Sequence, residues 1–298
     1  MRLLIAGSHG QVARAFLDAA PAAPDIEACA IGRPGLDICN SPTIERALSD
    51  IRPDVVINTA AYTAVDDAEG EAERAMALNR DGAAMLAAAA ARRGTPIIHL
   101  STDYVFDGAK PTPYAEDDPT APQSVYGRTK LEGEHAVAAA NPRHVILRTA
   151  WVYSPFGKNF VKTVLSHAGK GTPLKVVCDQ TGSPTYAPHL VAAILGVARK
   201  IASPGWAGAD PWGIYHAAGS GHASWYDLAR RILDRSAELG GPTTSLAPIG
   251  TDAYPTRAAR PKNSRLDCSK LRRVFTITQP DWRQGVDMCV ERLLAPQV

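Results

Sequence analysis

Short apolar runs alternate with longer segments of helical spacing in the first half of the chain. Five runs predict strands that are buried on both faces: residues 3–6, 26–31, 55–57, 96–100 and 145–147. Four segments predict helices: residues 11–20, a segment that Ser41 opens with Pro42 at its first position, residues 71–93 and residues 126–140. This alternation predicts an α/β fold with a doubly wound parallel sheet of the Rossmann type.

The second half of the chain has a less regular pattern. Strands are predicted at 174–177 and 214–216, and an amphipathic helix at 282–294. Residues 203–213 and 240–261 are rich in Gly, Pro and Ala, which is typical of loops. We therefore expect a dinucleotide-binding domain over residues 1–150. A smaller substrate-binding lobe is expected over residues 151–298, with some strands returning to the sheet.

Composition narrows the partners. Of 298 residues, 45% are hydrophobic and 21% are charged, and 32 Lys and Arg against 30 Asp and Glu leave a net charge of +2. Proteins that bind nucleic acid through their electrostatic field carry clustered basic charge, which this chain lacks. No apolar run approaches the about 20 residues that a membrane-spanning helix needs. We expect a cytoplasmic protein with no nucleic-acid or membrane partner.

Cysteines and histidines give no sign of a metal site. The five cysteines are scattered without a C-x-x-C pair, which indicates free thiols rather than a zinc site or a disulfide framework. The acidic residues 66–73 lack the spacing of a calcium loop. The eight histidines form no cluster, and His99, on a predicted strand, is interpreted as a packed histidine with satisfied hydrogen bonds. No metal is expected.

The first strand ends in a glycine turn that opens the first helix. Gly7 allows a tight turn, Gly10 lets the backbone approach a pyrophosphate, and Ala13 is small enough for close packing of helix on sheet. The N-terminus of a helix also favours an anion. The turn therefore predicts a dinucleotide cofactor, with five contacts expected from it: Gly7, His9, Gly10, Gln11 and Val12.

The end of the second strand bears on the choice of cofactor. Sites for NAD usually place an acidic residue there, whereas this chain has Arg33, which suits a 2′-phosphate. This favours NADPH and leaves NADH possible. Asp37 and Ile38 follow, and we expect them to flank the adenine.

A hydroxyl, a phenol and an amine form the candidate catalytic set. Thr102 ends a predicted strand, and Tyr126 and Lys130 are four residues apart, on one face of a predicted helix. Carbonyl reduction needs a proton donor beside the oxygen, and a neighbouring ammonium lowers the pKa of a phenol. Thr102 can hold the substrate oxygen, and Lys130 can also reach the nicotinamide ribose.

These motifs, in this order and with Asn58 to Ala61 after a strand, resemble those of the extended short-chain dehydrogenase/reductases. Longer strings over nearly the whole chain resemble one branch, the dTDP-4-dehydrorhamnose reductase family. They include Ala60 to Asp66, Ser101 to Phe106, Val125 to Leu131 and Asp179 to Thr185. The resemblance implies that NADPH reduces the 4-keto group of dTDP-4-dehydro-β-L-rhamnose to give dTDP-β-L-rhamnose.

The resemblance also implies roles for residues. Catalysis falls to Thr102, Tyr126 and Lys130, with Tyr126 protonating O4 of the sugar. Further cofactor contacts are implied for Ala60, Ala61, Tyr62, Asn79, Tyr126 and Lys130. Substrate contacts are implied for Val65, Thr102, Asp103, Tyr104, Trp151, Asn159, Arg260, Asn263 and Ser264.

Trp151 and Arg260 suit the roles implied for them, and each also has an alternative, purely structural role. An aromatic wall such as Trp151 fits the apolar face of a deoxysugar, and the alternative is a core aromatic. The guanidinium of Arg260 fits a diphosphate, and the alternative is an ion pair between Arg260 and a loop carboxylate.

Other features leave alternatives for the assembly and the activity. Some members of the family are dimers bridged by a metal through acidic side chains, but Ala15 and Pro188 offer no carboxylate at the matching positions. Bound Mg²⁺ is therefore not predicted, and a monomer and a homodimer both remain open. The alternative functions are another sugar-nucleotide 4-ketoreductase or epimerase of the same fold, and a non-catalytic regulatory subunit.

Overall fold

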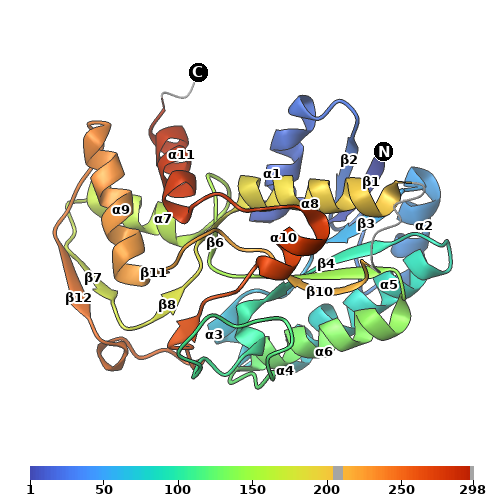
Figure 1. Ribbon diagram of the computed structural model, residues 1–298, viewed down its shortest axis with the longest axis horizontal. Coiled ribbons are helices and arrows are strands. Elements are labelled where there is room, and N and C mark those ends of the chain that lie inside the picture. The colour runs from blue at the N-terminus through green and yellow to red at the C-terminus, as the bar shows by residue number, and fades with distance from the viewer. Residues whose placement is uncertain (204–210, 296–298) are drawn as a thin grey trace.

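A six-stranded parallel sheet forms the centre of the molecule (Figure 1). The computed structural model describes residues 1–203 and 211–295. The strand order is β10-β5-β4-β3-β1-β2. The strands are β1 (Arg2–Ala6), β2 (Glu27–Ile31), β3 (Val55–Asn58), β4 (Ile97–Thr102), β5 (His144–Thr149) and β10 (Gly213–His216). These are the strands that the apolar runs predict, including the late strand at 214–216, and they confirm the doubly wound fold.

Helices cover both faces of this sheet (Figure 1). Helices α1 (Gln11–Ala19), α8 (Ala187–Ala202) and α10 (Ser269–Phe275) pack on one face, and α2 (Ser41–Ile51), α5 (Ala83–Ala91) and α6 (Val125–Ala140) on the other. Successive strand residues divide between the two faces, as a pleated strand requires: Leu3 and Ile5 contact the first layer and Leu4 the second. Burial on both sides explains why these strands are apolar throughout.

The order of the strands reverses at β1. The chain goes from β1 to β2 on one side and then returns to β3 on the other. In doubly wound sheets, ligands bind in the crevice beyond the carboxyl ends of the strands at this switch point. The candidate residues Gly7, Asn58 and Thr102 stand at or directly after the carboxyl ends of β1, β3 and β4.

The helix predicted over residues 71–93 forms as three consecutive helical pieces. They are α4 (Ala72–Met76), the π-helical η2 (Ala77–Gly82) and α5. Single π turns inside helices are frequent at functional sites, because the wider turn re-aims its side chains. Here the π turn contains Asn79, which is 1% exposed.

A smaller lobe lies beside the sheet and is built mainly from the second half of the chain (Figure 1). Helices α7 (Phe160–Gly169), α9 (Trp225–Glu238) and α11 (Trp282–Leu294) enclose a separate apolar core. Short strands complete it: β6 (Val152–Tyr153), β7 (Leu174–Val177), β8 (Thr181–Gly182), β9 (Thr185–Tyr186), β11 (Ala223–Ser224), β12 (Leu246–Ile249) and β13 (Asn263–Ser264). Four short helical segments lie elsewhere: α3 (Val65–Ala68), η1 (Ala20–Ala22), η3 (Asp103–Val105) and η4 (Thr251–Ala253).

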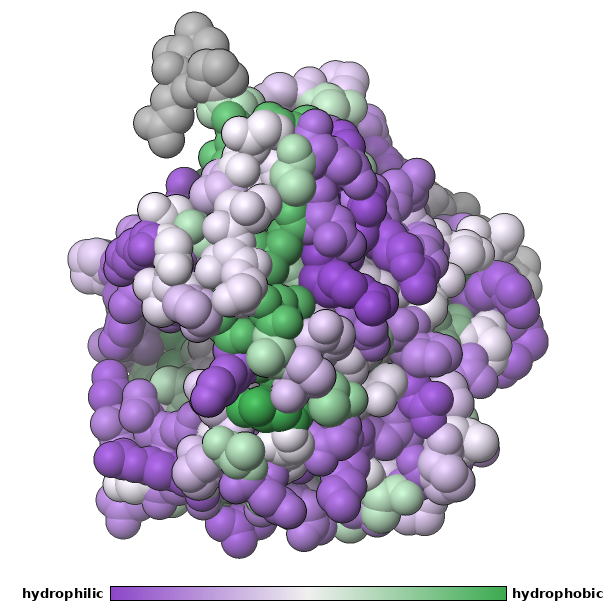
Figure 2. Space-filling view, turned by 90° about the vertical axis from the view of Figure 1, so that its left-hand side faces the viewer, coloured by the Kyte–Doolittle hydropathy of each residue, from purple (hydrophilic) through white to green (hydrophobic). Residues whose placement is uncertain are grey.

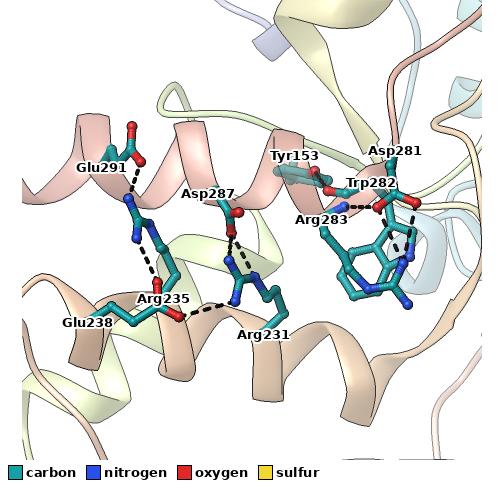
Figure 3. A network of polar contacts seen from close by, with 9 residues as sticks. All are labelled: Tyr153, Arg231, Arg235, Glu238, Asp281, Trp282, Arg283, Asp287 and Glu291. Atoms are coloured by element: carbon teal, nitrogen blue, oxygen red, sulfur yellow. Dashed lines mark hydrogen bonds and ion pairs between the residues drawn. The ribbon is translucent and has the colours of Figure 1, made fainter.

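Ion pairs join the facing sides of α9 and α11 (Figure 3). Arg231 contacts Asp287 at 2.6 Å, and Arg235 contacts both Glu238 and Glu291. Partly exposed pairs of this kind stabilise a protein by only about 0–1 kcal/mol each. The apolar faces of the two helices therefore supply most of the stabilisation between them.

The surface of the smaller lobe is mostly hydrophilic. Figure 2 shows this side of the molecule, where one narrow hydrophobic band crosses a largely hydrophilic face. Within residues 1–203 and 211–295, no helix has the length and apolar character to cross a membrane. In the same residues, no three His, Cys, Asp or Glu side chains are grouped to hold a metal ion.

Three expectations need correction. Residues 240–261 are not all loop, because β12 pairs with β7 in a two-stranded sheet that the Gly- and Pro-rich composition hid. The helix at Ser41 is capped by Asn40, whose side chain accepts a hydrogen bond from the Thr43 amide, and Pro42 therefore follows the first helical residue. The second half of the chain is more regular than its sequence pattern indicates, because it also contains the helices α7, α8, α9 and α10. Of the loop expected at 203–213, residues 204–210 lie outside the described residues.

Candidate active site

A cavity of about 570 Å³ opens at the carboxyl ends of β1, β3, β4 and β5. It lies at the switch point of the sheet, and residues of the smaller lobe close its other side. Many of the residues singled out from the sequence line it together: His9, Gly10, Gln11, Val12, Ala61, Val65, Thr102, Asp103, Tyr104, Tyr126, Lys130 and Trp151. Segments far apart in the sequence thus converge on one site.

The N-terminus of α1 faces the cavity without a side-chain cap. Gly10 is the N-cap residue, and a Cβ added to it would meet nothing within 4 Å. Gly7 has a φ of +111°, which only glycine adopts readily, and a Cβ there would lie 2.9 Å from Thr59 Oγ1. The first amides of a helix have no partner within the helix. The open space and the uncapped amides fit the pyrophosphate of a dinucleotide.

Gln11 uses its side chain to join α1 to the smaller lobe. Its Nε2 donates to the Val152 carbonyl at 3.2 Å, and its Oε1 accepts from the Ser154 hydroxyl at 2.8 Å. The side chain therefore spans the boundary between the sheet and the lobe at the rim of the cavity, and only its backbone amide is left for a cofactor.

Tyr126 and Thr102 place two hydroxyl groups at the centre of the site. Tyr126 lies in the first turn of α6, where the Ser124 side chain caps the helix. Its ring packs edge to face with the ring of Tyr104, with 5.5 Å between the ring centroids. Burial raises the pKa of the Tyr126 phenol well above its ordinary value, and a hydrogen bond with Thr102 opposes that rise. Tyr126 is therefore a neutral proton donor at physiological pH in the absence of ligands.

Lys130 lies one turn further along α6 and is 2% exposed. Its Nζ donates to the Leu100 carbonyl at 2.6 Å. Burial lowers the pKa of Lys130 to about 8, against the opposing charge of Glu134. The amine is thus charged at neutral pH and loses its charge within a range that an enzyme can use.

Asp103 follows Thr102 and is 3% exposed. Its Oδ1 accepts from the Thr102 hydroxyl at 2.9 Å, and burial raises the pKa of the carboxyl group to about 6. The neighbouring Ser264 hydroxyl of β13 opposes this rise. The hydrogen bond between Thr102 and Asp103 thus lies in the same cavity as the Tyr126 hydroxyl.

Asn79 acts one layer behind the cavity. Its Oδ1 accepts from the Tyr62 amide at 2.8 Å, and its Nδ2 donates to the Tyr62 carbonyl and to Thr129 Oγ1 at 2.9 Å. The Ala60 amide donates in turn to Asn58 Oδ1 at 3.1 Å. Asn79 therefore fixes the loop from Ala60 to Tyr62 against the helix that carries Tyr126 and Lys130.

Three residues expected at the adenine end lie outside this cavity. Arg33 is exposed after β2, and within the described part of the chain it shows no hydrogen bond or ion pair. Asp37 Oδ1 accepts from the Cys39 amide at 2.9 Å, which closes a local turn. Ile38 is 2% exposed and belongs to the core under α2 and α5.

Three residues expected on the substrate side have structural partners. Asn159 caps α7 through Oδ1 and donates to the Ser154 carbonyl at 2.7 Å. Asn263 donates to the Thr112 carbonyl at 2.8 Å and accepts from Arg265 Nε at 2.8 Å. Arg260 pairs with Asp66 at 2.6 Å, which is the alternative to a diphosphate contact, and its Nη1 is buried with no hydrogen-bond partner among the described residues.

Trp151 forms the wall of the cavity on the side of the smaller lobe. Its φ of +47° is uncommon for a bulky residue, and strain of this kind clusters at functional sites. The ring stacks on Trp225 at 3.6 Å with 7° between the planes, and a Cβ on Gly182 would overlap it. Sequence reasoning missed Trp225, because nothing in the local pattern at the start of α9 indicates a partner on another element.

Known proteins resemble the whole chain. A dTDP-4-dehydrorhamnose reductase of Sinorhizobium fredii is 49% identical over 294 residues, covering 99% of this chain and 98% of that protein. A probable dTDP-4,6-dihydroxy-2-methyloxan-3-one 4-ketoreductase of Streptomyces antibioticus is 39% identical over 301 residues, covering 100% of this chain and 97% of that protein. The structure of a Bacillus anthracis dTDP-4-dehydrorhamnose reductase in complex with NADP matches with a TM-score of 0.89 at 31% identity, covering 98% of this chain and 99% of that one.

These likenesses agree with the order of motifs along the chain and with the geometry of the cavity. Residues 1–295 match the family described as the RmlD substrate binding domain. The match spans the sheet and the smaller lobe alike. The chain belongs to the RmlD substrate binding domain family, and the dTDP-4-dehydrorhamnose reductases are its relatives.

Proposed function

We propose that this chain reduces the 4-keto group of dTDP-4-dehydro-β-L-rhamnose with NADPH to give dTDP-β-L-rhamnose. The observation that carries the proposal is that Thr102, Tyr126 and Lys130 line one cavity together with the uncapped N-terminus of α1. A proton donor and an anion site then lie within one ligand-sized space. The full-length match to relatives named for this reaction supports the substrate.

The cofactor end of the cavity has the groups that NADPH needs. When bound, NADPH supplies the hydride for C4 of the sugar. The amides of Gln11 and Val12, beside Gly10, would hold the pyrophosphate, and the exposed Arg33 would meet the 2′-phosphate. Asp37 and Ile38 would support the adenine end, and Lys130 would hold the nicotinamide ribose.

The reaction also needs a proton for O4. Tyr126 donates its phenolic proton to this oxygen as the C4–O4 double bond becomes a single bond, and the phenolate then regains a proton from solvent. The ammonium group of Lys130 lowers the energy of the phenolate while it exists. Thr102 Oγ1 donates a hydrogen bond that holds O4 in place, after turning away from Asp103.

The substrate end has an apolar wall and a guanidinium group. Trp151, Tyr104 and Val65 line the cavity and fit the apolar face and methyl group of a deoxysugar. Arg260 would exchange its pairing with Asp66 for the diphosphate, which offers it two oxygens in bidentate geometry. Asn159, Asn263 and Ser264 would act by fixing the segments around this end.

The need for NADPH also bears on the compartment in which the enzyme acts. We infer that this compartment is the cytoplasm, where the NADP pool is kept mostly in its reduced form, NADPH. All five cysteines are free, which suits a compartment that keeps thiols reduced. The mechanism itself uses none of them, so thiol-blocking reagents should leave the chemistry intact.

A coupled assay tests the activity. The purified chain is given dTDP-4-dehydro-6-deoxyglucose, a 3,5-epimerase and NADPH, and NADPH oxidation is followed by absorbance while NMR identifies the sugar. NADPH should be consumed only when the epimerase is present, with dTDP-β-L-rhamnose as the product. Consumption without the epimerase, or a product epimeric at C4, would indicate another 4-ketoreductase. Isomerised sugar without net NADPH consumption would indicate an epimerase, and nucleotide binding without turnover a regulatory subunit.

The role of Tyr126 has its own test. Tyr126→Phe removes the proton donor and keeps the ring, so kcat should fall by at least ~10²-fold, the range for loss of a general acid. NADPH affinity should change little. The matched control is Tyr254→Phe, which removes a phenolic hydroxyl from a residue that is 59% exposed and outside the cavity. Similar turnover in the two variants would contradict the mechanism.

A further inference from the structure

The buried His99 lies between Asn58 and the candidate catalytic lysine. It stands on β4 and is 1% exposed, as the sequence interpretation of a packed histidine predicts. The register of β3 and β4 places Asn58 directly opposite it, and Asn58 is 0% exposed. On its other side, His99 Nε2 faces Lys130 Nζ at 3.4 Å. The three side chains therefore form one line that ends at the site.

Hydrogen-bond donors and acceptors along this line decide the tautomer of His99. Asn58 Oδ1 accepts from the Ala60 amide at 3.1 Å, so the other end of the amide, Nδ2, faces His99 Nδ1 at 3.0 Å. An amide nitrogen only donates, so Nδ1 of His99 must accept. If the Asn58 side-chain amide were rotated, its Nδ2–H would face the N–H of Ala60, and two donors would meet. Burial and the nearby Lys130 hold the pKa of His99 well below its ordinary value, so the ring is neutral. Its single proton is therefore on Nε2.

This tautomer turns an N–H toward the lysine. A protonated Lys130 has three donors and no acceptor. Its N–H groups therefore face the N–H at Nε2 of His99, which is an unfavourable contact between two donors. A neutral Lys130 has a lone pair that accepts from Nε2–H, while its own N–H still donates to the Leu100 carbonyl. The hydrogen-bonding arrangement thus stabilises the uncharged amine relative to the ammonium.

We propose that His99, held as the Nε2–H tautomer by Asn58, is a positioning residue that favours release of a proton from the Lys130 ammonium group. The proposal rests on the proposed reductase function, in which Lys130 assists the phenol. The depressed pKa of Lys130 agrees with it. The consequence is an alkaline limit of turnover that the Asn58–His99 pair sets, because the phenol loses its cationic neighbour as pH rises through the pKa of the lysine.

Other charges around Lys130 act in the opposite direction or are paired. Glu134, one turn further along α6, raises the pKa of Lys130. Its carboxylate is bound by Arg148 of β5, at 2.7 Å and 2.9 Å, and by the Ser101 hydroxyl. The other titratable side chains that line the cavity are Tyr126 on α6, Asp103 and Tyr104 on η3, His9 in the glycine turn, and Lys158 on the side of the smaller lobe. Among these side chains, only His99 has an N–H that faces Lys130 Nζ directly.

Nuclear magnetic resonance tests the tautomer without any use of activity. Ring-¹⁵N-labelled histidine is introduced into the intact chain, and long-range ¹H–¹⁵N correlations are recorded across neutral and alkaline pH. The signal of His99 is assigned by its loss in His99→Gln. A protonated Nε2 and an unprotonated Nδ1, unchanged across this range, are expected. A proton on Nδ1, or a ring that titrates near neutrality, would overturn the proposal.

The variant Asn58→Asp reverses the tautomer with almost no change of shape. Its carboxylate still accepts from the Ala60 amide but now accepts from His99 as well, so the proton moves to Nδ1 and Nε2 offers a lone pair to Lys130. The alkaline limit of kcat should rise by about one pH unit or more, the scale on which such neighbours move a buried pKa. Asn141→Asp, which adds a buried carboxylate at the far end of α6, should leave the limit unchanged.

The possible failures are distinguishable. If the wild-type chain does not reduce the sugar nucleotide, the proposed function is wrong, and the tautomer of His99 is still measured by resonance. If the wild type is active and Asn58→Asp leaves the alkaline limit in place, the role of His99 is refuted and the reductase function stands. If Asn58→Asp does not fold, the wild-type tautomer alone decides.

Discussion

Single residues set the two anion contacts that we propose for the cofactor. Gly10 is the N-cap of α1, where Ser, Thr, Asp or Asn would normally satisfy the first amides. A glycine leaves those amides to a ligand. Arg33 has no partner within the described residues, although arginines elsewhere on this surface pair with carboxylates, as Arg292 does with Asp18 at 2.5 Å. Gly10 therefore lacks the stabilisation of a side-chain cap, and Arg33 lacks that of an ion pair within the described residues.

Substitution of Gly10 separates binding from folding. The variant Gly10→Asp has open space for its side chain and supplies a favourable cap and charge at the helix N-terminus. The free energy of unfolding should therefore stay the same or rise, while NADPH affinity falls sharply because a carboxylate occupies the place of the pyrophosphate. Denaturant unfolding and a fluorescence titration with NADPH measure the two effects. Unchanged NADPH affinity would exclude this turn from the cofactor site.

Substitution of Arg33 tests the choice between the cofactors. Arg33→Ala should weaken NADPH binding more than NADH binding, since only NADPH carries the 2′-phosphate. The matched control is Arg46→Ala, an exposed arginine on α2. Dissociation constants for both cofactors, measured on both variants, give the comparison. An equal loss for NADPH and NADH would remove Arg33 from the 2′-phosphate.

Helix α6 connects the candidate catalytic residues to the rest of the site through close packing. It carries Tyr126 and Lys130 toward the cavity, and Gly133 brings its backbone against the π turn at Asn79. No other side chain fits there, because a Cβ on Gly133 would overlap the Asn79 carbonyl. The hydrogen bond from Asn79 to Thr129 then ties the loop at Tyr62 to the same helix. The element thus positions two walls of the cavity at once.

A small substitution on this helix tests the connection. Gly133→Ala should destabilise the protein by about 1–3 kcal/mol, the usual cost of overpacking, and should lower kcat because Tyr62 and α6 move apart. Gly169→Ala in α7 is the control, since its Cβ would meet nothing within 4 Å and alanine favours a helix. Thermal unfolding and steady-state kinetics report both effects. Equal stability of the two variants would show that α6 and the π turn do not need this contact.

At the scale of the whole molecule, the cavity lies between two separately packed units. The sheet unit supplies the glycine turn, Thr102 and α6, and the smaller lobe supplies the environment of Trp151 through Trp225 and Gly182. Gln11 and Ser154 join the two units at the rim. This division predicts that cofactor and substrate affinities respond to different substitutions.

Trp151 provides the test of this division. Trp151→Ala should raise KM for the keto-sugar nucleotide and leave NADPH binding intact, because the removed wall belongs to the side of the smaller lobe. Loss of NADPH affinity to the same degree would mean that the two units do not bind their ligands separately. Unaffected kinetics would instead assign Trp151 to the core, and its stack with Trp225 to structure alone.

The sequence alone predicted the sheet, the glycine turn and the candidate catalytic residues, because the pattern that indicates each of them is local. Doubly buried strands are apolar throughout, a tight turn needs Gly7, and Tyr126 and Lys130 share a face through helical spacing. Such features depend on neighbours a few residues away. They could therefore be predicted without any knowledge of long-range contacts, and the structure places them together.

Only the tertiary structure decided which partners these residues have. Three sets of contacts join segments that are far apart along the chain: the pair of Arg260 with Asp66, the stack of Trp151 on Trp225, and the contacts from Asn58 through His99 to Lys130. The physical reason is that hydrogen bonds and ring contacts act over a few ångströms in space, without regard to separation along the chain. The proton affinity of Lys130 is therefore a property of the folded molecule.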